Sequence, residues 1–286
     1  MTLLITAANG ALGRLVIDSL LARGVAPSEI VAGARTPARA ADLAERGITV
    51  VPLDYDAPET VDAAFAGVDR VLLISGSEVG KREAQHRTVV EAAKRAGVDQ
   101  LAYTSLAKIE GSSLPLAAEH LATERAIAES GLPATILRND WYAENYAANL
   151  AQADATGVLL SATHGGRVSA AARADYAEAA AVALIGDSHI GKTYELAGTP
   201  VTYDEIAAAL GEVLGREVVH QDVSAEELQA ALTGAGLDAG TIGFLVALDA
   251  GIAAGDLDVE DPTLSELIGR DTTPLVEALR AAHAAA

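Results

Sequence analysis

The sequence predicts an α/β fold: a doubly wound parallel sheet with helices on both faces, followed by a smaller α+β C-terminal lobe. In the first half of the chain, near-continuous Val/Ile/Leu runs alternate with helical patterns, as expected of strands buried on both faces. Such strand–helix repetition gives right-handed crossovers. The 286 residues are enough for one large domain with an appended lobe.

Six strands are expected in the first half, at residues 2–7, 30–35, 48–53, 70–75, 100–105 and 133–138. Helices are expected after them, at residues 11–23, 37–46, 58–66, 80–96, 115–130 and 141–154. Beyond Gly157 the alternation loosens, and we expect a helix over 172–185 and short strands over 193–196 and 217–220. The predicted domains are residues 1–156, with a later contribution near 172–198, and a lobe over residues 157–286 packed on the sheet's carboxyl edge.

Composition narrows the function classes. The net charge of −20 argues against nucleic acid and anionic membrane as partners, because both would repel the chain. The absence of cysteine excludes disulfides, thiol catalysis and cysteine-based metal sites, and it fits a reducing cytosol. With no signal peptide and no bilayer-length apolar run, a cytoplasmic location is expected. The sequence leaves open whether the chain forms a homo-oligomer.

The turn after the first strand carries the clearest functional signal. Gly10 and Gly13 stand between the apolar run at residues 3–5 and the first helical pattern. Glycines there let a pyrophosphate approach backbone N–H groups at a helix N-terminus, where the helix dipole also favours negative charge. A Gly-x-x-Gly can also serve a plain tight turn, but its place on the first strand and first helix favours a nucleotide-binding Rossmann domain.

The end of the second strand indicates which dinucleotide. NAD-selective folds place an acidic residue about 20 residues after the glycines. Here Arg35 takes that place, and Arg39 follows within one helical turn. Guanidinium binds phosphate as a bidentate fork, so we predict that Arg35 binds the 2′-phosphate of NADP with support from Arg39. The alternative is a solvated arginine pair at the start of a surface helix.

Further candidates follow later strands, because ligands of open α/β sheets bind beyond the strands' carboxyl ends. The segment Ser75-Gly76-Ser77 suits backbone contact with a cofactor, although a turn needs such residues equally. Ser105 could hydrogen-bond a substrate carbonyl or form a helix cap. The Asn139 amide could serve either the nicotinamide or the substrate.

Three of the chain's few aromatic side chains, Trp141, Tyr142 and Tyr146, follow Asn139. A flat apolar ligand stacks well on such side chains. Residues 142 and 146 would share one face of the predicted helix, so they could equally anchor that helix to the body of the protein.

The histidines offer little evidence of a metal site. None of the six has the spacing of a ligand pair, so no metal is expected. His120 could form an acid/base group with Glu119 and Glu124, but we favour a surface histidine on a charged helix face. No Gly-x-Ser-x-Gly elbow is present, which argues against an α/β-hydrolase.

Together these segments resemble the NmrA-like branch of the atypical short-chain dehydrogenase/reductases, and within it the bacterial NAD(P)H:quinone oxidoreductases of type 2. The resemblance covers almost the whole chain. It rests on the motifs Gly10-x-x-Gly13 and Arg35-Thr-Pro-x-Arg39 and on residues 72–80, 85–87, 102–106, 119–120, 137–139, 141–142, 144–146, 173–176 and 194–198.

The resemblance implies an NADPH site and assigns its residues. The pyrophosphate would lie at the turn formed by Thr6, Ala7, Ala8, Asn9, Gly10, Ala11, Leu12 and Gly13. The adenosine phosphate would lie at Arg35, and Arg173 would close the site. The ribose and nicotinamide would lie among Ser75, Gly76, Ser77, Asn139, Trp141, Tyr142 and Glu144.

Two departures from the family pattern matter. Ala7 replaces the first fingerprint glycine, and a methyl group at this tight turn is expected to weaken or reshape cofactor binding without forbidding it. The usual Tyr-x-x-x-Lys acid is missing, and the fifth helix offers His120 and Glu124 instead. Quinone reduction tolerates that loss, because hydride delivery gives a stabilised phenolate that can take a proton from water.

We therefore expect NADPH-dependent hydride transfer to a quinone or a similar flat acceptor. Asn139 and Tyr142 are the predicted catalytic residues, and Trp141, Tyr146 and Ser105 the predicted substrate-binding residues. One alternative is a non-catalytic NADP(H)-binding redox sensor of the NmrA type, although the aromatic residues beside Asn139 favour the enzyme. Another is a tailoring enzyme acting on an aromatic polyketide quinone.

Overall fold

The main sheet has seven strands in the order β3-β2-β1-β4-β5-β6-β9, and all of them except β9 come from the first half of the chain. Its strands are β1 (Leu3–Ile5), β2 (Ile30–Ala34), β3 (Thr49–Pro52), β4 (Arg70–Leu73), β5 (Gln100–Leu106), β6 (Ala134–Asn139) and β9 (Thr193–Leu196). All pairings from β3 through to β6 are parallel. Because the chain order reverses at β1, the carboxyl ends of β1 and β4 form the topological switch point where such sheets bind ligands.

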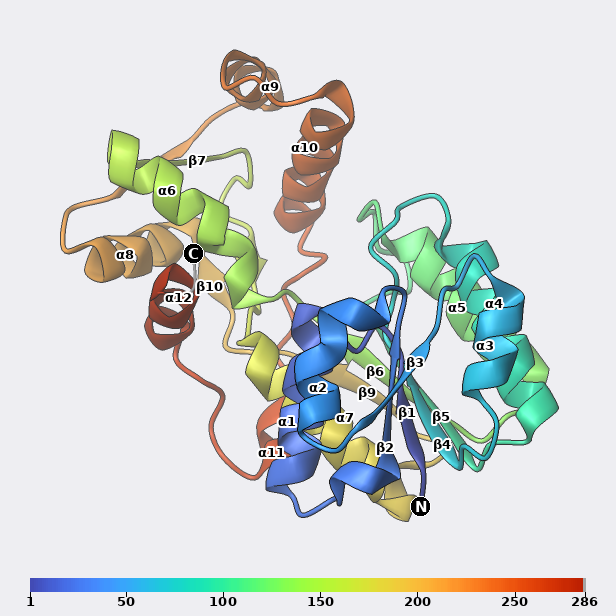
Figure 1. Ribbon diagram of the computed structural model, residues 1–286. Coiled ribbons are helices and arrows are strands. Elements are labelled where there is room, and N and C mark those ends of the chain that lie inside the picture. The colour runs from blue at the N-terminus through green and yellow to red at the C-terminus, as the bar shows by residue number, and fades with distance from the viewer. Residues whose placement is uncertain (285–286) are drawn as a thin grey trace. The chain divides into compact units, whose positions relative to one another are not determined.

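Helices cover both faces of this sheet in the computed structural model, which describes residues 1–284 (Figure 1). On one side lie α3 (Pro58–Ala64), α4 (Arg82–Ala96) and α5 (Ala117–Ser130). On the other lie α1 (Ala11–Ala22) and α7 (Arg173–Ile185). The short helix α2 (Ala41–Glu45) follows a 3₁₀ turn at Pro37–Ala40.

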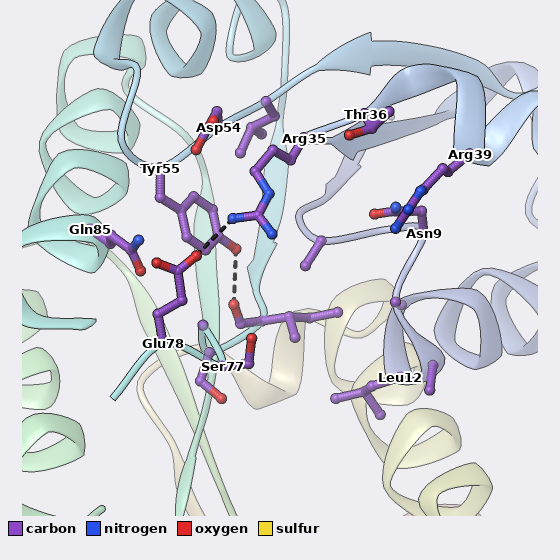
Figure 2. A pocket seen from close by; sticks show the side chains of 18 residues that line it. Asn9, Leu12, Arg35, Thr36, Arg39, Asp54, Tyr55, Ser77, Glu78 and Gln85 are labelled. Atoms are coloured by element: carbon purple, nitrogen blue, oxygen red, sulfur yellow. Dashed lines mark hydrogen bonds and ion pairs between the residues drawn. The ribbon is translucent and has the colours of Figure 1, made fainter. Parts of the chain in front are cut away.

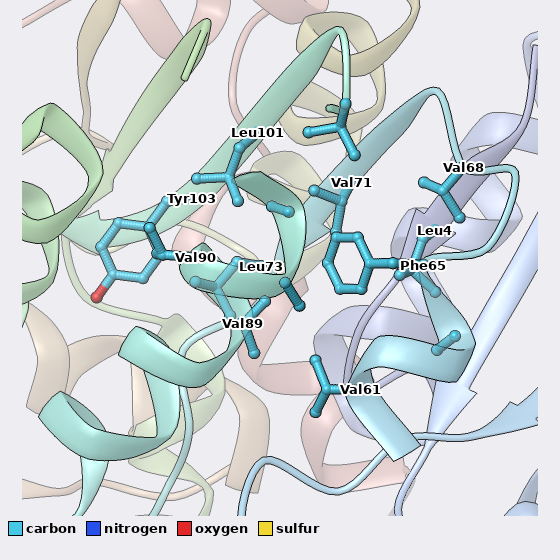
Figure 3. Close-up of a cluster of buried hydrophobic side chains, with 14 of the residues drawn as sticks. Leu4, Val61, Phe65, Val68, Val71, Leu73, Val89, Val90, Leu101 and Tyr103 are labelled. Carbon is cyan, nitrogen blue, oxygen red and sulfur yellow. The ribbon is translucent and has the colours of Figure 1, made fainter. Parts of the chain in front are cut away.

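The hydrophobic core under α3 and α4 explains why the strand sequences are apolar runs (Figure 3). Leu4, Leu73 and Leu101 point from neighbouring strands towards Phe65 and Val89, and all five are buried. Burial of each such side chain contributes about 1.5–3 kcal/mol. This packing fixes the strand register and therefore the positions of the strand ends.

By contacts, the chain divides into two units. The first comprises Met1–Leu106, Ala118–Asn139 and Ala174–Tyr194, and the second comprises Ala107–Ala117, Asp140–Arg173 and the chain from Glu195. In the second unit β7 (Val158–Ser161) pairs in parallel with β11 (Val219–Asp222), and β8 (Arg167–Val168) pairs antiparallel with β10 (Val201–Thr202). Its helices are α6 (Ala147–Thr156), α8 (Tyr203–Leu214), α9 (Ala225–Gly234), α10 (Ala239–Ala253), α11 (Thr263–Ile268) and α12 (Leu275–Ala284).

Capping boxes start two of the helices of the second unit. The Thr202 hydroxyl accepts from the Glu205 N–H while the Glu205 carboxylate accepts from the Thr202 N–H, and Ser224 and Glu227 repeat the pattern. Each cap satisfies backbone donors that the first helical turn leaves open, which is worth about 1 kcal/mol. No helix within residues 1–284 combines the length and apolar character needed to cross a bilayer.

The predicted fold class is confirmed, but the expected helix over residues 141–154 is wrong at its start. A 3₁₀ turn occupies Ala143–Tyr146, and α6 begins only at residue 147. The Asp140 N–H donates to the Leu196 carbonyl, and the Trp141 carbonyl accepts from the Ala171 N–H. These long-range bonds hold residues 140–142 extended, so residues 142 and 146 do not share an α-helical face.

Candidate functional site

The turn between β1 and α1 presents backbone donors. The Ala8 N–H donates to the Gly33 carbonyl at 2.9 Å, which fixes the turn to β2. Gly10 is the N-cap of α1, and no side chain caps the helix there. The first turn of this 12-residue helix therefore keeps N–H groups for an anion, and the helix dipole adds attraction.

Glycine at position 13 lets the helix pack against this turn. A Cβ on Gly13 would lie 2.6 Å from the Ala7 carbonyl oxygen and 2.8 Å from the Ala8 Cα, both of them backbone atoms. Ala7 itself has φ +47°, in the left-handed region that favours glycine. Alanine at position 7 therefore adopts a backbone conformation that glycine adopts more readily.

A cavity of about 340 Å³ opens at this turn and runs along the carboxyl ends of β1, β2, β3 and β4. Figure 2 shows the side chains that line it, with Arg35 and Glu78 close together at its centre. The predicted cofactor residues that line it are Asn9, Gly10, Ala11, Leu12, Gly13, Arg35, Ser75, Gly76 and Ser77, and Arg39 joins them. Uncapped helix amides, glycine clearance and two guanidiniums in one cavity fit a phosphorylated dinucleotide.

Two predicted residues of the turn are buried and do not line the cavity. The side chain of Ala8 is buried. Thr6 Oγ1 donates to the Leu72 carbonyl, accepts from the Ile74 N–H, and accepts from the Tyr55 hydroxyl at 2.5 Å. Thr6 thus ties the end of β1 to β4. Burial raises the pKa of Tyr55, so its phenol keeps its proton as donor to Thr6.

Arg35 is already paired at the end of β2. Its Nη1 donates to Glu78 Oε1 at 2.7 Å, and Lys81 Nζ lies 2.8 Å from Glu78 Oε2. Lys81 and Arg35 together hold the pKa of the Glu78 carboxyl below its usual value. Glu78 also raises the pKa of Arg35. The side chain of Arg35 is 64% exposed, so it is open to a ligand.

Hydrogen bonds to buried side chains fix the backbone of the loop between β4 and α4. The Ser75 N–H donates to Thr104 Oγ1, and the Gly76 N–H donates to His86 Nε2, both at 2.9 Å. Burial, with the charge of Arg82, lowers the pKa of His86 to about 4, so the ring is neutral near pH 7. Because its Nε2 accepts, we assign the ring proton to Nδ1, which lies 2.8 Å from Thr123 Oγ1. These bonds position the loop and leave the Ser77 side chain for a ligand.

The structure corrects the expectation for His120. It is 4% exposed rather than on the surface, and its Nδ1 lies 2.7 Å from the Tyr103 hydroxyl. Burial lowers its pKa to about 3. Helix periodicity could not show this contact, because Tyr103 lies on another element, β5.

Ser105 and Glu124 are bound to each other. The Ser105 hydroxyl donates to Glu124 Oε1 at 2.5 Å, and Arg138 donates to both oxygens of Glu124 at 3.0 and 2.7 Å. Ser105 is buried, and Glu124 is a partner of Arg138 rather than of His120. Asn139, also buried, ends β6 opposite Leu106 of β5.

The remaining predicted residues lie in the second unit. Both Glu144 carboxylate oxygens accept from the Arg173 N–H at 3.0 Å, and the Arg173 guanidinium lies 5.1 Å from the centre of the Tyr142 ring. Trp141 is half-buried. Tyr146 is buried and packs edge-on against Tyr203, so at least part of its role is structural.

Among the residues that line the cavity and were not predicted are Asp54, Tyr55 and Glu78. The first two follow β3, so the rule applied to the other strand ends would have found them. Glu78 lies 43 residues from Arg35 in sequence, and no local pattern indicates their pairing. Within residues 1–284 no group of three His, Asp or Glu side chains is arranged to hold a metal ion.

Fold and site together define a dinucleotide-binding α/β protein. The family described as NAD(P)H-binding matches residues 7–185, and the chain belongs to this family and to its NmrA-like branch. An NmrA-like family domain-containing oxidoreductase of Aspergillus flavus, flvB, is 31% identical over 98% of this chain and 94% of its own length.

The names of two further relatives state an activity or a bound cofactor. Quinone oxidoreductase 2 of Escherichia coli is 46% identical over 96% of both chains. The crystal structure of that NADPH-dependent enzyme with NADPH matches with a TM-score of 0.93, covering 97% of this chain and 98% of the other at 45% identity. Triphenylmethane reductase of Citrobacter with NADP(H) also has a TM-score of 0.93, at 39% identity, covering 98% and 100%.

Proposed function

We propose that this protein is an NADPH-dependent oxidoreductase that transfers hydride to a quinone or a similar flat electron acceptor. The observation that carries the proposal is the cavity at the sheet's switch point, in which the uncapped N-terminus of α1 and the guanidiniums of Arg35 and Arg39 meet. Full-length similarity to a quinone oxidoreductase supports the acceptor class. The absence of cysteine supports a cytoplasmic location.

Different residues of the site would bind different parts of the cofactor. The amides at the start of α1 would bind the diphosphate, and Arg35 with Arg39 would bind the adenosine 2′-phosphate. Ser77 would contact the ribose, and Asn139 would orient the nicotinamide or the acceptor carbonyl. When bound, NADPH supplies the hydride; the protein's contribution is to hold the acceptor and to set its orientation.

Neither His120 nor Glu124, the two candidates on α5, offers the acid that a ketone reductase needs. His120 is buried and neutral, and Glu124 is an ion-paired carboxylate. A quinone needs no such acid, because the product phenolate is stabilised and takes its proton from water. Trp141, Tyr142 and Tyr146 are the proposed aromatic wall of the acceptor site, with Glu144 and Arg173 holding the Tyr142 segment.

Steady-state NADPH oxidation with a panel of acceptors tests the proposal. We expect benzoquinones and naphthoquinones to be reduced, and unactivated ketones not to be. A triphenylmethane dye belongs in the panel because of the Citrobacter relative. Tight NADPH binding without turnover of any acceptor would favour a redox sensor, and efficient ketone turnover would require an acid that this site lacks.

A further inference from the structure

We propose that Glu78 is a specificity-determining residue that competes with the adenosine 2′-phosphate for Arg35 and so lowers the protein's preference for NADPH over NADH. The inference rests on the proposed function, because it concerns the same cofactor cavity. Its basis is the carboxylate that the loop after β4 brings to the guanidinium at the end of β2 (Figure 2).

The contact occupies one of the nitrogens that a phosphate needs. A guanidinium binds phosphate through two parallel N–H groups, and Glu78 Oε1 already accepts from Arg35 Nη1 at 2.7 Å. A phosphate that binds the Nη1/Nη2 pair must displace this carboxylate, and one that binds the Nε/Nη2 pair lies on the same guanidinium beside it. If the carboxylate stayed on Arg35, the carboxylate and the phosphate would share one guanidinium, and their like charges would repel each other.

Glu78 has another partner when it leaves Arg35. Lys81 Nζ lies 2.8 Å from its second oxygen, so the carboxylate keeps one ion pair after displacement. The Arg35 side chain is 64% exposed and that of Glu78 33%, so water screens the pair. The Arg35–Glu78 ion pair is therefore weak enough for a phosphate to displace it. Its removal should still produce a measurable change in the Kd of a phosphate-bearing ligand.

The position of Glu78 gives the competition its selectivity. NAD-selective folds place a carboxylate at the end of β2 to accept from the ribose 2′-hydroxyl. Here Arg35 occupies that place, and the carboxylate comes from the loop before α4 instead. Glu78 competes only with a ligand group that binds Arg35. Removing its charge should therefore tighten the binding only of ligands that carry a 2′-phosphate.

Calorimetric titration of Glu78→Gln tests this without any turnover. The probes are adenosine 2′,5′-bisphosphate and adenosine 5′-monophosphate, with NADPH and NADH titrated in parallel. We expect the variant to bind the bisphosphate and NADPH about three- to fivefold more tightly and to leave the other two within about twofold. In an Arg35→Ala background the same substitution should have no effect.

Glu83→Gln is the matched control, because Glu83 is an exposed carboxylate on α4 that pairs with Arg87 and does not line the cavity. Equal tightening by Glu83→Gln, or persistence of the gain in the Arg35→Ala background, would show a net-charge effect and overturn the proposal. Unchanged or weaker bisphosphate binding by Glu78→Gln would also overturn it. Cofactor binding without quinone turnover would refute the proposed function and not this inference.

Discussion

Replacing Arg35 with alanine should weaken NADPH binding and leave NADH binding nearly unchanged. A hydrogen bond between charged groups is worth about 1.5–3 kcal/mol. The Arg35 side chain is 64% exposed and already pairs with Glu78, so the lower end applies: about 1.5 kcal/mol, or roughly a tenfold rise in the Kd of NADPH. NADH lacks the 2′-phosphate and should lose less than about twofold.

Titration of both cofactors by fluorescence or calorimetry measures this difference. Arg46→Ala is the control, because it removes the same charge from an exposed arginine that pairs with Asp18 and does not line the cavity. Equal losses for NADPH and NADH in Arg35→Ala, or a similar NADPH loss in Arg46→Ala, would refute the assignment of Arg35 to the 2′-phosphate.

Four further predictions follow from the site. Gly13→Ala should destabilise the fold by about 1–3 kcal/mol and weaken NADPH binding, because its Cβ would lie 2.6 Å from the Ala7 carbonyl; an unchanged Tm would contradict this. His86 titrates at about 4 in the folded chain against an ordinary 6.5, so its contribution, up to about 3 kcal/mol, is full above pH 6.5 and is lost as pH falls towards 4. Thermal melts at pH 7 and 5 should differ more for the natural chain than for His86→Gln. Asn139→Ala should lower kcat more than it weakens NADPH binding, and the reverse would make Asn139 a binding residue only. Exhaustive EDTA treatment should leave quinone reduction intact; loss that a divalent ion restores would show a metal requirement.

Much of the fold could be predicted because its signals are local. The buried parallel strands are short apolar runs, and the strand at Thr193–Leu196 has the predicted bounds. The turn before α1 and the Arg35–Arg39 segment were predicted from the position of glycine and arginine at strand ends, and both line one cavity. The predicted function of the two domains and the roles of the individual site residues stay predictions.

What could not be predicted depends on contacts between distant segments. Residues 140–142 are extended because Ala171 and Leu196 bond their backbone. His120 is buried because Tyr103 lies against it, and the Arg35–Glu78 pair joins residues from two strand ends. Such long-range partners override a helical pattern or a charge pattern that a sequence shows over a few residues.

The central claim, hydride transfer from NADPH to a quinone, is tested most directly by a single turnover. The protein is loaded with one equivalent of NADPH and mixed in a stopped-flow instrument with a naphthoquinone, while the nicotinamide absorbance is followed and the hydroquinone is measured. The account predicts loss of the reduced nicotinamide with one hydroquinone formed per NADPH, and no such loss with cyclohexanone. Bound NADPH that stays reduced in the presence of excess quinone would contradict it.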